Sequence, residues 1–409
     1  MINRIWMSYS RSEAVEYCCL NYFFQACGIW AVNCEEQTGS SEEEVYLSIL
    51  GPDEISSIPP YFEGHIYLVK RNSTTISLRR KDVVTFKWHR AEEGFGQLMG
   101  QLFQNAEECT GIRELIKIFM QEKLWSAFWL YHEVAYEENP SWDAYISEIC
   151  KKVKKQLRIS KLFPASWHHR FMSLYCDYIL CAVSEKSMIS RSVRCSDLLN
   201  QCMELSEKSG WIPGLCILAA RICRLSKLEE KYALYYYRSV MKYGDSSENL
   251  YDIGNVYEKL YGDPESAMDY YKKSWQMDRS NYRSLYKIAV DLEDRGEWMN
   301  ALRRYEWIRF QLKRDKAKNS ISTRKIEYEY KVQKRIIWLV KLHMDDVELL
   351  KLFQKELQAL EESLRTRTDF RKLIHCMFGK EGQKTKGETE KEEEILRELQ
   401  KRVMRVCTK

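Results

Sequence analysis

The chain has 409 residues, of which 45% are hydrophobic and 30% are charged, and this balance excludes both a chain that is disordered throughout and one that is embedded in a membrane. The 64 Lys and Arg residues against 59 Asp and Glu leave a formal charge of +5, which is too small on a chain of this length to indicate a nucleic-acid partner. Only 17 Gly and 7 Pro accompany 26 Tyr and 12 Trp, so the composition disfavours a turn-dense all-β fold and favours long helices.

The N-terminal part alternates short apolar runs with helix-type and turn-type segments. We predict strands at Ile5–Ser8 and Ile29–Val32, with a helix at Arg11–Ala26 between them that stops before Gly28. A crossover of this kind makes the two strands parallel neighbours. The opening is therefore typical of an α/β fold.

The alternation of strand-type and helix-type segments continues after a polar loop. We predict a short helix at Val45–Leu50 and strands at His65–Val69 and Val83–Trp88. A helix at about Glu93–Phe103 would then close the sheet. These elements predict a small α/β domain over residues 1–108.

From about Cys109 the pattern becomes helical, and part of it repeats every 34 residues. An alanine, a tyrosine four residues later and a packing residue three further on recur at that interval. The columns are Ala233, Ala267 and Ala301; Tyr237, Tyr271 and Tyr305; and Val240, Ser274 and Ile308. A period that is fixed at three positions at once indicates stacked helix pairs.

Each repeat is predicted to contain two helices. One pair is Leu250–Leu260 with Pro264–Met277, and the next is Ser284–Asp294 with Met299–Leu312. Gly296 supplies the turn inside the second pair. The alanines would lie where paired helices approach most closely, and the tyrosines would fill the gap to the following pair.

These residues resemble the tetratricopeptide repeat (TPR) family, whose 34-residue units carry small and aromatic residues at fixed positions of a helix pair. The match is best over Ser247–Asp278, nearly as good over Tyr282–Leu312, and weaker over Ile112–Pro140. The family's proline after the second helix is replaced by Arg279. The resemblance implies an α-solenoid over residues 109–378, and the alternative is a helical array without a repeat.

The N-terminal part is similar to a TIR domain, a flavodoxin-like signalling fold. The similarity rests on Arg4–Arg11, on Gly28–Val32 and on His65–Ser73. Some members of that family hydrolyse NAD with a Glu on the helix after the strand that corresponds to His65–Val69, but Ser73–Lys81 reads STTISLRRK and contains no Glu. The catalytic residue is therefore missing from its expected place. The alternative is a small α/β domain that only packs against the array.

No other constellation predicts a catalytic, metal or cofactor site. His168 and His169, near Cys176 and Cys181, would point about 100° apart on a helix and are poorly placed to share a metal. His375–Cys376 has no orienting carboxylate, and no Gly-rich phosphate loop occurs. The 14 cysteines include no CxxC pair, which is typical of reduced, buried thiols.

The C-terminal end differs in composition from the array. Residues 379–389 combine glycines with charged and polar residues and are predicted to form a flexible linker. Residues 390–409 predict an amphipathic helix with one apolar stripe. The stripe consists of Ile395, Leu399, Val403 and Val406. So short a helix needs a partner, which is this chain's own array, another copy of the chain or another protein.

The sequence therefore predicts a multidomain, mainly α protein, in which a small α/β domain precedes an α-solenoid of TPR-like helix pairs. We expect an adaptor or scaffold that binds a protein or peptide in a groove lined by the first helices of successive pairs. By family resemblance, the groove residues are Tyr251, Asn255, Glu258, Tyr286, Val290 and Glu293.

The alternative is a nucleotide-acting signalling enzyme, or a degenerate relative of one, regulated by the repeats. The lack of an apolar leader and of a long apolar span predicts a cytoplasmic chain without a membrane anchor.

Overall fold

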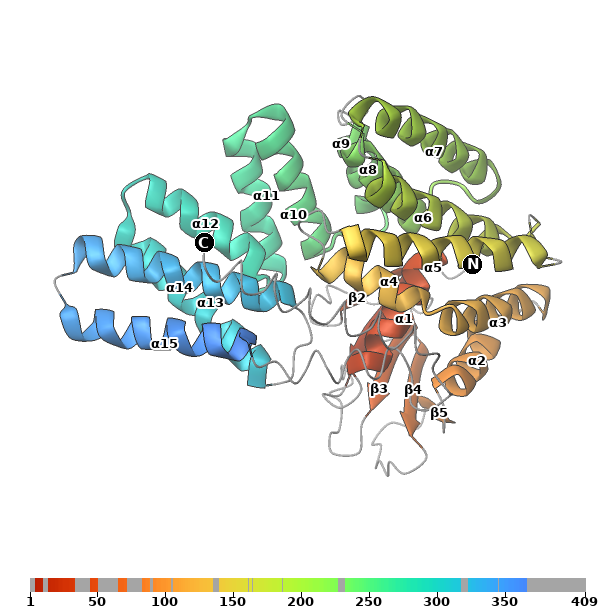
Figure 1. Cartoon of the computed structure of the whole chain (residues 1–409), viewed down its shortest axis with the longest axis horizontal. Coiled ribbons are helices and arrows are strands. Elements are labelled where there is room, and N and C mark those ends of the chain that lie inside the picture. Colours follow the sequence, from red (N-terminus) through yellow and green to blue (C-terminus); the bar gives the residue numbers. More distant parts are fainter. Residues whose placement is uncertain are drawn as a thin grey trace. The chain divides into compact units, whose positions relative to one another are not determined.

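Figure 1 shows the computed structural model of the chain. The residues that it describes are 4–9, 14–33, 45–50, 65–71, 83–88, 91–103, 106–134, 140–160, 162–163, 165–185, 187–226, 232–317, 323–344 and 346–365. The chain divides into two compact units, Met1–Asp263 and Pro264–Lys409. The predicted boundary at residue 108 lies inside the first unit, whereas the predicted linker at 379–389 and helix at 390–409 lie outside the described residues.

The first unit is built on a five-stranded, fully parallel sheet with the spatial order β2, β1, β3, β4, β5. The strands are β1 Arg4–Tyr9, β2 Trp30–Asn33, β3 Val45–Leu50, β4 His65–Arg71 and β5 Val83–Trp88. This is the strand order of flavodoxin-like doubly wound sheets. The α/β prediction is therefore confirmed, and helix α1 (Ala14–Ala26) joins the parallel neighbours β1 and β2.

The prediction of a helix at Val45–Leu50 is wrong, because this segment is β3, the central strand of the sheet. It pairs with β1 on one side and with β4 on the other. Its residues from Val45 to Ile49 are all buried. A strand that is covered on both faces loses the alternation of polar and apolar residues, so a short apolar run does not distinguish a strand from a helix.

The other helices of the first unit pack against one another largely in chain order. They are α2 Ala91–Leu102, α3 Ala106–Gln121, α4 Leu124–Trp129, α5 Pro140–Ile159, α6 Trp167–Ser184, α7 Met188–Ser209, α8 Pro213–Leu225, α9 Ala233–Met241 and α10 Ser247–Val256, with π-helical turns η3 Leu130–Val134 and η5 Tyr257–Tyr261. Each helix from α5 to α9 contacts the next one, and α1 contacts α4 and α6. None of the helices described is long and apolar enough to cross a membrane.

Helices from much later in the chain cover one face of the sheet. The hydrophobic cluster there contains Trp6, Trp30 and Tyr46 on the sheet side. On the helix side it contains Cys216 of α8 and Val240 of α9. A fully parallel sheet needs cover on both faces, and α8 and α9 supply part of that cover. The sheet and these two helices therefore share one core.

Two close contacts fix this junction between sheet and helices. Arg4 at the start of β1 donates a hydrogen bond from Nη1 to the carbonyl oxygen of Tyr243, 3.0 Å away and just after α9. Its guanidinium carbon lies 4.0 Å from the ring centroid of Trp6. Gly214 of α8 lies so close to the turn before β2 that a Cβ on it would be 2.0 Å from the Gly28 carbonyl oxygen. Only glycine permits this approach.

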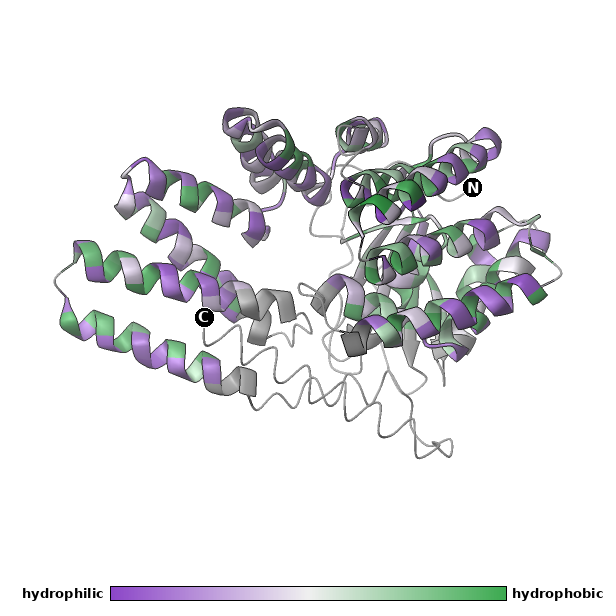
Figure 2. Cartoon of the chain, turned by 45° about the horizontal axis from the view of Figure 1, so that its top comes forward, coloured by the Kyte–Doolittle hydropathy of each residue, from purple (hydrophilic) through white to green (hydrophobic). Residues whose placement is uncertain are grey.

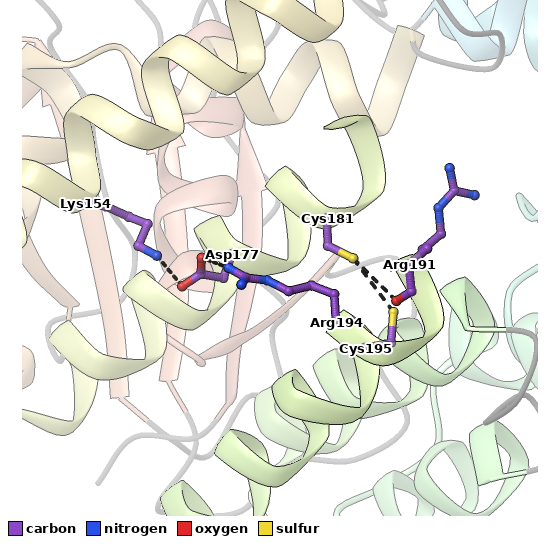
Figure 3. A network of polar contacts seen from close by, with 6 residues as sticks. All are labelled: Lys154, Asp177, Cys181, Arg191, Arg194 and Cys195. Carbon is purple, nitrogen blue, oxygen red and sulfur yellow. Dashed lines mark hydrogen bonds and ion pairs between the residues drawn. The ribbon is translucent and has the colours of Figure 1, made fainter. Parts of the chain in front are cut away.

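An ion-pair network ties together α5, α6 and α7 (Figure 3). The buried Asp177 of α6 pairs with Lys154 of α5, and its other carboxylate oxygen lies 3.3 Å from Arg194 of α7. Each buried charge needs an opposite charge to offset the loss of its hydration. One carboxylate therefore links three successive helices.

Two buried thiols lie in the same helix interface. The sulfur of Cys181 on α6 is 3.9 Å from the sulfur of Cys195 on α7, as Figure 3 shows. This hydrogen bond lowers the pKa of Cys181 and raises the pKa of Cys195. The cysteines in the described part of the chain are free thiols. They pack as small apolar side chains, as the sequence predicted.

The second unit is helical over its described residues. Its helices are α11 Pro264–Met277, α12 Tyr282–Asp294, α13 Trp298–Ala317, α14 Thr323–His343 and α15 Val347–Arg365. Each one packs against the next. Figure 2 shows hydrophobic and hydrophilic residues alternating along them, as in helices that bury one stripe. Gly296, with a φ of 78°, forms the predicted turn between α12 and α13.

The residues of the 34-residue columns are buried in the two units. All nine column residues are at most 2% exposed, and the predicted helix Pro264–Met277 is α11 itself. The helical-repeat prediction is therefore confirmed. The best-matching repeat, Ser247–Asp278, is shared between the units, since α10 belongs to the first and α11 to the second.

The approach of α8 to the turn before β2 gives a first prediction. Gly214→Ala in the full chain should lower the free energy of unfolding by about 1–3 kcal/mol, because the added methyl group must displace the Gly28 carbonyl. Urea unfolding followed by circular dichroism measures the change.

Gly96→Ala in α2 is the matched control, since a Cβ at Gly96 meets nothing within 4 Å. Replacing a helical glycine by alanine in open space should raise stability by up to about 1 kcal/mol. Equal stabilities of the two variants would contradict the close packing of α8 on the sheet.

Candidate functional site

The first three predicted groove residues lie in the first unit. Tyr251 and Asn255 on α10 are buried, at 8% and 6% exposed. Glu258 on η5 is exposed. The two α10 side chains therefore offer a ligand little surface.

The other three predicted groove residues share one face of α12 in the second unit. Tyr286, Val290 and Glu293 recur at intervals of four and three residues, and all are partly buried. Val290 and Tyr286 pack against the core between α12, α13 and α14. Tyr286 also borders a hollow on the surface of the unit.

This hollow has a volume of about 340 Å³ and lies between α12 and α14. Besides Tyr286, it is lined by Lys331, Lys334, Arg335 and Trp338, all on α14. These four positions fall at helical spacing on one stripe. We call these five residues the α12–α14 surface.

The opposite stripe of α14 explains why this face is exposed. Val332, Ile336 and Leu339 are buried in the core of the second unit. A helix that buries one stripe presents the residues of the other stripe to solvent. Trp338 on that outer stripe is 48% exposed, which is unusual for so large an aromatic side chain.

Glu293 neutralises one of the three cations. Its carboxylate accepts a hydrogen bond from Nη1 of Arg335 at 2.8 Å and another from the Tyr305 hydroxyl at 2.9 Å. Partial burial acts to lower the pKa of Arg335, but Glu293, Tyr286 and Tyr305 together outweigh it, so the pKa is raised. Burial and the same carboxylate raise the pKa of Tyr305, so its phenol stays protonated and donates.

The two lysines have no such partner. Over the residues that the structure describes, neither Lys331 nor Lys334 pairs with a carboxylate, and both are exposed. Their ammonium nitrogens lie 5.5 Å from the ring of Tyr328 and 5.4 Å from that of Tyr330. The α12–α14 surface therefore combines exposed aromatic area with two uncompensated positive charges, which suits an anionic ligand that also carries apolar groups.

Sequence reasoning found only one residue of this surface, Tyr286. It missed the four on α14 because the repeat columns were followed only as far as Leu312. A signal was nevertheless present, since two lysines, an arginine and a tryptophan share one helical stripe opposite the buried one.

The adjacent histidines have structural contacts. Nδ1 of His168 lies 2.9 Å from the carbonyl oxygen of Cys27, and its Nε2 lies 3.1 Å from Glu108. This second hydrogen bond lowers the pKa of Glu108. His168 thus joins α6 to α3 and to the turn before β2. Within the described ranges, no three His, Cys, Asp or Glu side chains are grouped as metal ligands.

No protein-family model and no curated protein matches the sequence. Among solved structures, the chain is similar to a monomeric mutant of IFIT1 with Gppp-AAAA, at 12% sequence identity and a TM-score of 0.28. The match covers 72% of this chain and 65% of that chain, so this chain spans less than two thirds of the length of that structure. A TM-score of this size assigns neither a fold nor a ligand.

The contacts of Glu293 give a second prediction. Glu293→Gln keeps an acceptor for Tyr305 but removes the charge that faces Arg335, so the free energy of unfolding should fall by about 1 kcal/mol. Urea unfolding measures the change. The control is Glu306→Gln, an exposed position on α13, which should leave stability within about 0.5 kcal/mol of the wild type. If both variants unfold at the same urea concentration, Glu293 does not hold α14 against α12.

Proposed function

We propose that this protein is an adaptor that binds an acidic peptide segment of a partner protein on the α12–α14 surface. The observation that carries the proposal is the hollow of about 340 Å³ in which Tyr286 and Trp338 lie beside three cationic side chains. Such a surface offers apolar contact area and positive charge at the same place.

The positive charges of this surface favour a negatively charged ligand. Glu293 satisfies Arg335, so Lys331 and Lys334 remain to attract carboxylates. Each exposed ion pair contributes only about 0–1 kcal/mol, so the lysines alone would bind an acidic segment weakly. They speed the encounter and set the orientation of the ligand more than they add affinity.

The aromatic residues supply the rest of the affinity. Trp338 is 48% exposed, and tryptophan is among the residues that contribute most when a partner covers them. A ligand that places an apolar side chain against Trp338 and carboxylates near the lysines uses both properties of the surface. We infer a segment in which Glu or Asp alternates with Leu, Ile or aromatic residues.

The position of the surface agrees with how helical repeats bind ligands. Successive helix pairs leave their first helices along one face, and α12 and α14 are the first helices of neighbouring pairs. Tyr286, Val290 and Glu293 of the predicted groove belong to this proposal. Tyr251, Asn255 and Glu258 lie in the other unit and are not part of this proposal.

The sheet does not by itself support the enzyme alternative. A flavodoxin-like strand order serves many unrelated functions, so activity must come from a site. The segment Ser73–Lys81, where a TIR-type catalytic Glu would stand, lies outside the described residues. Neither a TIR-type activity nor a nucleotide substrate is part of this proposal.

A segment of the chain itself has the acidic and apolar residues that the proposed ligand needs, and it can serve as a probe. Glu388–Leu399 reads ETEKEEEILREL, which combines six glutamates with apolar residues. A fluorescein-labelled peptide of this sequence should bind a chain that ends at Arg365, and added salt should weaken the binding. Lys331→Glu together with Lys334→Glu should lower the affinity about tenfold or more in fluorescence anisotropy.

Lys355→Glu, an exposed lysine on α15, is the matched control and should change the affinity less than about threefold. Weaker binding by the full chain than by the shortened one would identify the chain's own tail as the occupant. Tighter binding of a single-stranded RNA that is lost in the same double variant would replace the peptide proposal. Equal affinities of the double variant and the control would refute it.

A further inference from the structure

The first unit contains a cavity of about 60 Å³ at the junction between the sheet and the helices. Its walls come from the end of α1, from the turn and strand around β2, and from α6, α8, α9 and α10. A single buried water needs only about 10–15 Å³ of such space. The cavity therefore has room for several waters or for a small organic molecule.

One wall of the cavity contains an arginine whose N–H donors are only partly used. Within the part of the chain that the structure describes, Arg221 of α8 donates a hydrogen bond from Nη1 to the Tyr175 hydroxyl at 2.8 Å. The guanidinium group has five N–H donors. Burial raises the pKa of Tyr175 to about 12, so this hydrogen-bond partner is neutral. The negative charge that acts on Arg221 is the carboxylate of Asp252, which lines the same cavity and helps to raise the pKa of Arg221.

Another wall carries an unpaired acceptor. Asn249 of α10 is 4% exposed, and its Nδ2 donates to the carbonyl oxygen of Tyr237 at 3.1 Å. That bond fixes the orientation of the amide, because a carbonyl oxygen can only accept. The other amide atom, Oδ1, has no hydrogen-bond partner in the described structure. A buried acceptor without a donor is rare in folded proteins.

Carboxylates complete the lining. Asp252 and Glu248 of α10 both border the cavity. One oxygen of Asp252 lies 3.4 Å from Nη1 of Arg224, outside the cavity, so it is partly neutralised there. The cavity thus presents a cation on α8 opposite carboxylates and an orphan amide oxygen on α10.

From this arrangement we propose that the cavity binds a small zwitterion of the amino-acid class, with its carboxylate at Arg221 and its ammonium group at Asn249 Oδ1 and Asp252. An arginine fork matches a carboxylate, and an ammonium group donates up to three hydrogen bonds to oxygen acceptors. A simple anion such as phosphate would meet the carboxylates of Asp252 and Glu248 as well as the cation. This site is independent of the α12–α14 surface, which belongs to the other unit.

The ligand would also affect the fold. Trp30 from the sheet and Arg221 and Asn249 from the helices line the same cavity, so a molecule held there contacts both layers of the first unit. A ligand that binds the folded state and not the unfolded one raises the melting temperature. Thermal unfolding is therefore a direct readout of occupancy.

The test is thermal unfolding and isothermal titration calorimetry of the full chain with each of the twenty amino acids. Propionate, propylamine and inorganic phosphate serve as partial probes. We expect at least one small amino acid to raise the melting temperature and to bind at least about tenfold more tightly than propionate or propylamine, because only the zwitterion satisfies both walls. No binding by any amino acid, or equal binding of propionate, would overturn the proposal. Ordered water alone would then fill the cavity.

Variants locate the site. Arg221→Lys keeps the charge but loses the fork, and it should weaken the same amino acid at least about tenfold. Arg170→Lys on α6, whose side chain does not line the cavity, should leave the affinity within about threefold. If Arg221→Lys does not fold, Asn249→Leu removes the orphan acceptor without removing a charge and should weaken the same ligand. Unchanged affinity in either cavity variant would place the ligand elsewhere.

Discussion

The structure of the first unit depends on the need of a fully parallel sheet for cover on both faces. Strand β3 lies at the centre of that sheet with its residues from Val45 to Ile49 buried. Backbone groups can pair along the sheet, but the apolar side chains of its two faces need helices against them. For one face, α8 and α9 meet that need through Cys216 and Val240, more than a hundred residues beyond the last strand. Because the sheet needs this cover, the α/β part and the first helices of the array form one compact unit.

Other features of the unit follow from that shared core. Gly214 allows α8 to reach the turn before β2, and Arg4 connects the first strand to the end of α9. The cavity with Arg221 and Asn249 lies where these layers meet, so elements from both ends of the unit line it. The second unit contains the α12–α14 surface, where α14 exposes the aromatic and basic stripe that its core packing does not use. The two proposed sites thus differ in chemistry and lie in separate units.

Local patterns predicted much of this structure, and non-local pairing accounts for what they missed. The 34-residue spacing predicts a buried position for Ala267 and Tyr271, and each is 1% exposed. The segment Val45–Leu50 was misassigned because its state is decided by β1 and β4, which lie far from it in sequence. Likewise, the repeat pattern predicts Tyr286, whereas Trp338 joins the α12–α14 surface only because α14 packs beside α12 in the folded chain. No periodicity could show that Arg221 and Asn249 border one cavity, since α8 and α10 are separate helices.

The shared core of sheet and helices is the central claim, and native-state hydrogen exchange tests it most directly. The full chain would be followed by mass spectrometry at increasing urea, comparing amides of β1 around Trp6 with amides of α8 around Ala220. If the sheet and α8 share one core, both sets will exchange through the same opening, with equal free energies and equal dependence on urea. Continued protection of the α8 amides after those of β1 have exchanged would show that the helical array folds without the sheet, and would contradict this account.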